Sequence, residues 1–123
     1  MSIAKKWFQQ ALEDLDTAEY CFDGGKYYAA GFWAQQAIEK ALKAVWIAKG
    51  KGLKKTRELA FLAEEVGAPR EVVADVAVVS PLEMKARYLD YEGETPKEAV
   101  DERRAHNAVL TARKVIEWCK TRI

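Results

Sequence analysis

The sequence is poor in the residues that build metal sites and disulfides. It contains two cysteines, Cys21 and Cys119, and a single histidine, His106. A structural zinc site needs four ligands at close spacings, and a di-iron bundle needs a Glu-x-x-His pair on each of two helices. Neither set is present, so we expect no metal and no cofactor. The cysteines are interpreted as small core residues of a reduced compartment, without a disulfide.

Long apolar runs and an excess of one charge are also missing. No apolar stretch reaches the about 20 residues that a membrane-spanning helix needs, and the N-terminus lacks the apolar segment of a signal peptide. Lysine and arginine number 20 and aspartate and glutamate 19, which gives a formal net charge of +1. Proteins that bind nucleic acid through bulk charge are usually far more basic. The sequence therefore predicts a cytoplasmic protein without a membrane segment, in which any nucleic-acid contact comes from a local basic patch.

Helical periodicity dominates what is present. Apolar residues recur every three or four positions over 3–22, 26–49, 56–66, 69–79 and 95–123, the spacing of one buried helix face. The last segment begins with Thr95-Pro96-Lys97-Glu98, a capping box with proline in the first turn. We predict one all-α domain over 1–123, an up-and-down bundle of four to five antiparallel helices. Strict alternation would make the first and last helices parallel and place both cysteines at the same end.

Two segments carry candidate functional side chains. In 26–49, an apolar and alanine-rich helix, polar residues interrupt one face at helical spacing: Gln36, Glu39, Lys40 and Lys43. They form either a solvated stripe with one Glu39–Lys43 ion pair or a groove that contacts a ligand or partner. The acidic residues of the first segment, Asp14 among them, are expected mainly on its solvent side.

The second segment is the aromatic stretch 87–91, Arg-Tyr-Leu-Asp-Tyr. An arginine fork flanked by aromatic rings suits phosphate contact and base stacking. The alternative is structural, with Tyr88 and Tyr91 covering the core and Arg87 paired with Asp90 or Glu92.

Two stretches together resemble HEPN domains, namely 27–43 (YYAAGFWAQQAIEKALK) and 86–90 (ARYLD). The opening 7–18 (WFQQALEDLDTA) and the closing 112–118 (ARKVIEW) also fit. The resemblance implies a bundle of four or five helices, usually a homodimer. It also implies frequent pairing with a minimal nucleotidyltransferase, in toxin–antitoxin-like systems. Some members of the family are RNA-cutting toxins, and others are non-catalytic nucleotide or RNA binders.

The sequence departs from the nuclease members of that family. They carry an arginine followed four to six residues later by a histidine, whereas His106 follows Arg103 and Arg104 too closely and no histidine follows Arg87 at that spacing. The general acid or base of that reaction is therefore missing from its usual spacing. On its own, His106 is interpreted as an ordinary histidine on a helix.

We therefore expect a binding module rather than an enzyme. Its groove for a nucleotide, an RNA or the partner is predicted from five residues: Gln36, Lys40, Lys43, Arg87 and Tyr88. Two alternatives stay open. One is a metal-independent ribonuclease toxin that uses Arg103, Arg104 and His106, and the other is a dimeric scaffold without a ligand.

Overall fold

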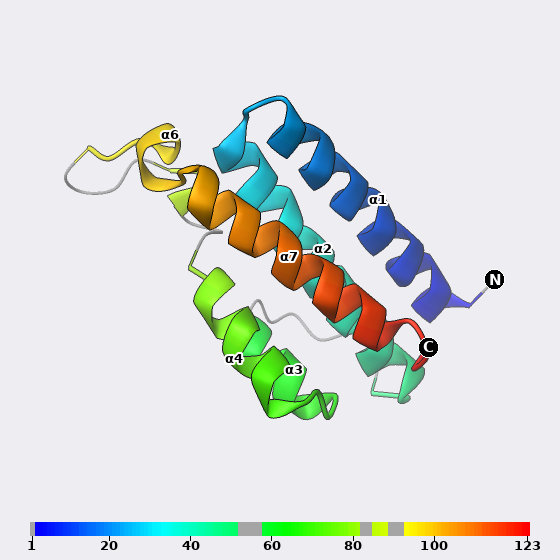
Figure 1. Cartoon of the computed structure of the whole chain (residues 1–123). Helices are drawn as coiled ribbons and strands as arrows, with labels where there is room; N and C mark the ends of the chain where they lie inside the picture. The colour runs from blue at the N-terminus through cyan, green and yellow to red at the C-terminus, as the bar shows by residue number, and fades with distance from the viewer. Residues whose placement is uncertain (1, 52–57, 82–84, 89–92) are drawn as a thin grey trace.

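The chain folds into a helical bundle in the computed structural model, which describes residues 2–51, 58–81, 85–88 and 93–123. The helices are α1 (Ile3–Asp23), α2 (Tyr27–Ala48), α3 (Leu59–Glu65), α4 (Arg70–Val79), α6 (Pro96–Ala99) and α7 (Glu102–Cys119) (Figure 1). No strand occurs in these ranges, so the predicted all-α class is confirmed. Over the same ranges, no helix combines the length and the apolarity needed to cross a bilayer.

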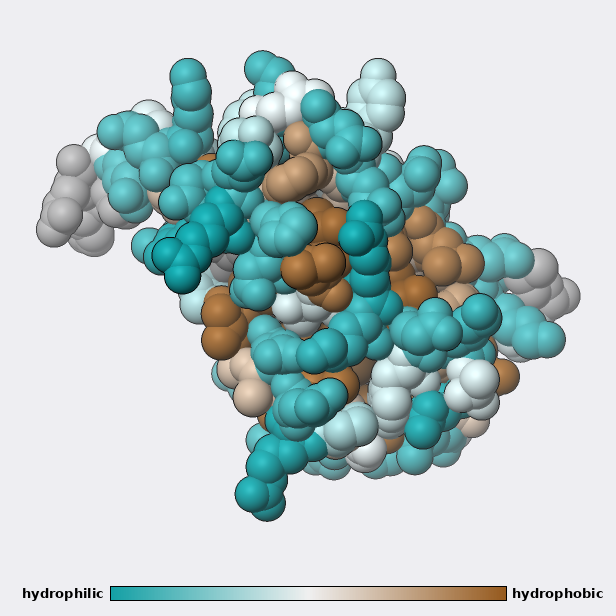
Figure 2. Space-filling model, in the orientation of Figure 1, coloured by the Kyte–Doolittle hydropathy of each residue, from teal (hydrophilic) through white to brown (hydrophobic). Residues whose placement is uncertain are grey.

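Helix α2 lies at the centre of the bundle and contacts α1, α3, α6 and α7. Five of its alanines are fully buried, at Ala30, Ala34, Ala37, Ala41 and Ala44. Small side chains shorten the distance at which two helices pack, and this is why one helix can be surrounded by several others. Figure 2 shows that hydrophilic side chains cover most of one face of the molecule and separate smaller hydrophobic patches.

The first and last helices run in opposite directions, so the predicted parallel arrangement is wrong. Phe22 near the end of α1 lies against His106 near the start of α7, with 5.7 Å between ring centroids. At the other end of the two helices, Lys5 of α1 and Lys120 line the same pocket. Both termini therefore lie at the same end of the bundle (Figure 1).

The strict alternation of directions fails between α2 and α3. Lys51, just after α2, forms an ion pair with Glu65 at the end of α3, at 4.0 Å. The two helices therefore end at the same level and run in the same direction. As a result Cys21 and Cys119 lie at opposite ends of α1 and α7, and both are free thiols.

The segment predicted as one helix over 95–123 is two helices. The capping box is present as expected. The Thr95 hydroxyl accepts a hydrogen bond from the Glu98 backbone N–H, and the Glu98 carboxylate accepts one from the Thr95 backbone N–H. Val100 then adopts an extended conformation (φ −116°, ψ 95°). The Asp101 carboxylate accepts a hydrogen bond from the Arg104 backbone N–H at 2.9 Å and begins α7. Aspartate is a preferred N-cap residue, so the local sequence at Asp101 explains why a second helix begins there.

Candidate functional site

The polar residues of α2 lie on one face of the helix and meet α1 there. Lys40 forms an ion pair with Asp14 of α1. The other carboxylate oxygen of Asp14 accepts a hydrogen bond from the Gln10 side chain at 2.9 Å. The Asp14 side chain is only 3% exposed and that of Lys40 21%. Asp14 was expected on the solvent side, and the structure buries it between the helices.

Lys43 is held by a second set of partners on the same face. Its ammonium lies 3.3 Å from the Glu39 carboxylate, with side-chain exposures of 11% and 14%. The same ammonium lies 5.7 Å from the ring centroid of Trp7 of α1. Partly buried charges of this kind need a partner, because desolvation penalises an unpaired ion heavily. The positive charges of Lys40 and Lys43 are therefore largely balanced by carboxylates of the chain itself.

Arg87 and Tyr88 border the same face of α2 at its N-terminal half. The Arg87 guanidinium donates a hydrogen bond to the Tyr88 hydroxyl at 2.9 Å and lies 5.5 Å from the ring centroid of Phe32. Tyr88 is 49% exposed. The alternative partners of Arg87, Asp90 and Glu92, and the second tyrosine, Tyr91, lie outside the described residues.

Three of the five predicted residues lie on α2, and the other two lie near Phe32 of that helix. Phe32, Gln36, Lys40 and Lys43 follow one another at intervals of four, four and three residues, so they share one face of α2. Lys43 comes eleven positions after Phe32, which is about 16 Å along the axis. The structure thus places the predicted residues along one strip, in a cluster near Phe32 and another near Trp7, rather than around one pocket.

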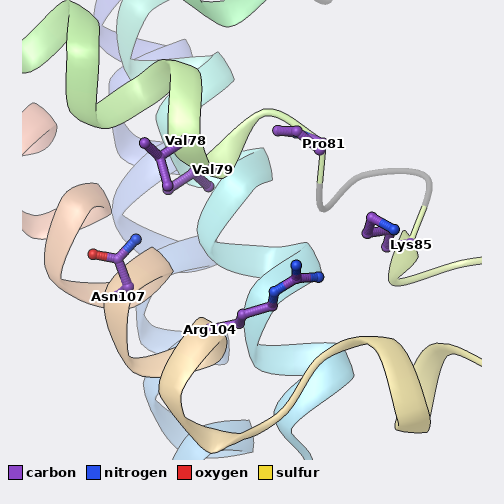
Figure 3. Close-up of a pocket in the computed structure, with 6 residues that line it drawn as sticks. All are labelled: Val78, Val79, Pro81, Lys85, Arg104 and Asn107. Carbon is purple, nitrogen blue, oxygen red and sulfur yellow. The ribbon is translucent and has the colours of Figure 1, made fainter.

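A pocket between α4 and α7 is lined by residues from three parts of the chain. It has a volume of about 240 Å³ and is lined by Val78, Val79, Pro81, Lys85, Arg104 and Asn107 (Figure 3). The end of α4 supplies the apolar wall, and α7 supplies Arg104 and Asn107. In Figure 3 the Arg104 side chain extends from α7 toward the side on which Lys85 lies. One guanidinium nitrogen of Arg104 donates to the Ala99 carbonyl at 3.1 Å, which holds the side chain and leaves further donors.

The chemistry of this pocket favours an anion. Two cationic side chains and one amide line it, and no carboxylate is among the described residues that do so. Hydrogen bonds between charged groups are roughly twice as strong as neutral ones, and the guanidinium fork matches the geometry of phosphate. Lys85 and Asn107 were missed at the sequence level, where Arg104 was named only as an alternative catalytic residue. The i,i+3 spacing of Arg104 and Asn107 places them on the same face of one helix, and this was the sequence signal that could have identified them.

The three residues of the ribonuclease alternative do not converge within the chain. Arg104 and His106 are two residues apart on α7, so their side chains point about 200° apart around the helix. Arg104 lines the α4–α7 pocket, whereas the exposed His106 lies against Phe22 of α1. Arg103 is exposed and is not one of the pocket residues.

Comparison with known proteins gives a consistent result for the whole chain. A family model described as HEPN domain matches residues 4–122. Among solved structures, TT1696 from Thermus thermophilus is 26% identical, with 100% of each chain covered and a TM-score of 0.91. ST0689, described as an archaeal HEPN homologue, is 30% identical over 98% of each chain, with a TM-score of 0.83.

A third structure extends the likeness of fold. The HEPN domain protein TM0613 from Thermotoga maritima is 24% identical, with 94% of this chain and 95% of that chain covered and a TM-score of 0.73. A search of curated proteins gave no match.

Proposed function

Because the chain belongs to the HEPN domain family, we propose that it is a binding module for the phosphate of a nucleotide or an RNA. The observation that carries the proposal is the pocket between α4 and α7. There Lys85, Arg104 and Asn107 supply hydrogen-bond donors without a carboxylate among the described lining residues. A phosphate oxyanion needs several donors of this kind at one place, and arginine binds it in a bidentate manner.

The position of Tyr88 supports the proposal that the ligand carries a nucleobase. Tyr88 follows Lys85 by three residues, which is at most about 10 Å of extended chain, and its ring is half exposed. Stacking of a base on an aromatic side chain contributes about 1–3 kcal/mol and is tolerant of sequence. A nucleotide with its phosphate at Lys85 and Arg104 can therefore place its base on Tyr88. In this proposal Tyr88 keeps the base-stacking role predicted from the sequence, whereas Lys85 and Arg104 take the phosphate contact that was predicted for Arg87.

Titration of the labelled protein with ATP and with a short single-stranded RNA, followed by amide NMR, tests the proposal. We expect saturable shifts at Lys85, Arg104 and Asn107, and recovery of intact RNA, since Arg104 and His106 do not converge. A hydrogen bond to a charged group contributes about 1.5–3 kcal/mol, so Arg104→Gln is expected to weaken binding about tenfold or more.

Arg103→Gln is the matched control, because it removes the same charge from the adjacent position outside the pocket. Equal losses in the two variants would mean that the ligand senses only the general charge of α7. RNA cleavage abolished by His106→Ala would instead favour the ribonuclease alternative.

Association with other chains is proposed on family membership. We propose that the module forms a homodimer and pairs with a minimal nucleotidyltransferase in a toxin–antitoxin-like system. Light scattering of the protein alone and with a candidate nucleotidyltransferase tests both points. A monomer in both samples would contradict them without affecting the phosphate pocket.

A further inference from the structure

A second pocket lies where α1 meets the polar face of α2. It has a volume of about 250 Å³ and is lined by Lys6, Trp7, Gln10 and Lys40. None of these residues belongs to the α4–α7 pocket. We infer that this second pocket binds an aromatic carboxylate, through its ammonium and amide donors on one side and the Trp7 indole on the other.

Two donors of the pocket, on Lys40 and Gln10, are fixed in position and are not used up. Lys40 donates to one oxygen of Asp14 and Gln10 to the other, and Asp14 is almost completely buried. An ammonium has three N–H donors and a side-chain amide has two. Each group therefore retains at least one donor after bonding to Asp14. Donors already held in place lose little conformational entropy when a ligand binds.

The charge of the pocket fits a monoanion. Asp14 balances Lys40 and Glu39 balances Lys43. Lys6 is exposed, and none of the ion pairs within the described part of the chain includes it. The group of five charged side chains thus has one positive charge in excess. A single carboxylate matches this excess, whereas the phosphate dianion is better matched by the two cations of the α4–α7 pocket.

The shape and the walls of the pocket fit an aromatic ring. The Trp7 indole is half-buried and held against the Lys43 ammonium, so its orientation is constrained. The methylene stems of Lys6 and Lys40 add apolar surface. Pockets for drug-sized ligands begin at roughly 300 Å³, so a pocket slightly below that limit suits a ligand with one ring.

The test uses benzoate as the probe, with benzyl alcohol and inorganic phosphate as comparison compounds at constant ionic strength. We expect benzoate to cause saturable NMR shifts of the Trp7 indole N–H and the Gln10 side-chain amide at millimolar concentration. Benzyl alcohol lacks the charge and phosphate lacks the ring, so each is expected to bind at least threefold more weakly. Phosphate binding as tight as that of benzoate would overturn the inference, as would benzoate shifts that do not saturate.

Substitution of Lys6 identifies the site. Lys6→Gln removes the excess charge at an exposed position and is expected to lower benzoate affinity at least threefold. The matched control is Lys5→Gln, because Lys5 is the neighbouring exposed lysine and lines the separate groove between α1 and α7. Trp7→Leu is expected to lower affinity further. Equal effects of the Lys6 and Lys5 variants, or full affinity in Lys6→Gln, would refute binding in this pocket.

Discussion

Replacement of Lys40 by alanine is expected to destabilise the fold strongly. The substitution leaves Asp14, 2% exposed, with Gln10 as its remaining partner. Removal of one partner of a buried ion pair costs about 3–5 kcal/mol, because the remaining charge is desolvated without compensation. Since the Lys40 side chain retains one fifth of its exposure, water reaches part of the site and the lower end, about 3 kcal/mol, is expected.

Thermal and urea unfolding followed by circular dichroism measure this effect. For a chain of 123 residues, about 3 kcal/mol corresponds to a decrease in Tm of roughly 10 °C. The control is Lys114→Ala, which removes an ion pair to Asp75 with an N–O distance of 2.7 Å. Both side chains of that pair are exposed, 48% and 41%, so little change in Tm is expected.

A double variant separates unpaired charge from lost packing. Asp14→Leu combined with Lys40→Met replaces the pair by apolar side chains of similar size, which is often neutral or stabilising. Its unfolding free energy is therefore expected to lie within about 1 kcal/mol of the parent protein. If the double variant is as unstable as Lys40→Ala, the reasoning from buried charge is refuted and lost packing is the cause. A loss below about 1 kcal/mol in Lys40→Ala would show that the pair is solvated.

Two further predictions concern α7. Burial raises the pKa of the Cys119 thiol from its ordinary value of 9.0 to about 12, so above pH 9.0 the unfolded chain loses a proton that the native state keeps. The contribution of this thiol to the free energy of unfolding is complete below that pH and falls by about 1.4 kcal/mol per pH unit up to about pH 12. Urea unfolding of the parent protein and of Cys119→Ala at alkaline pH checks this. Equal slopes of unfolding free energy against pH in the two proteins would contradict it. Asp101→Ala removes the N-cap of α7 and is expected to cost about 1 kcal/mol, whereas Glu102→Ala, at the next position, is expected to cost less in the same urea assay.

The sequence was sufficient to predict the helices wherever local chemistry decides their ends. Helix α1 ends before Gly24 and Gly25, and the second of these adopts a positive φ of 76°, a conformation that glycine reaches without strain. The capping box at Thr95 was predicted for the same kind of reason. The break at Asp101 was missed because the apolar periodicity continues through it, although aspartate followed by a polar turn is itself a start signal.

Features that depend on distant parts of the chain were not predictable. Lys40 and Asp14 are 26 residues apart, and each was read as a surface residue of its own helix. The position of Asp14 did carry a signal, because it lies three residues after Ala11 and four before Ala18, both fully buried. The α4–α7 pocket joins Pro81, Lys85 and Arg104, and it exists only because α4 and α7 pack side by side. No pattern within one helix indicates that contact.

The Asp14–Lys40 pair also determines the register in which α1 lies on α2. The buried alanines of α2, such as Ala34, Ala37 and Ala41, are nearly equivalent to one another, so apolar packing alone discriminates weakly between neighbouring alignments. A shift of α1 by one turn, about 5.4 Å, would move Asp14 away from Lys40 and toward Gln36 or Ala44. The Asp14 carboxylate would then be buried without its counter-ion, at a cost of several kcal/mol. One polar contact thus restricts the interface between α1 and α2 to a single alignment.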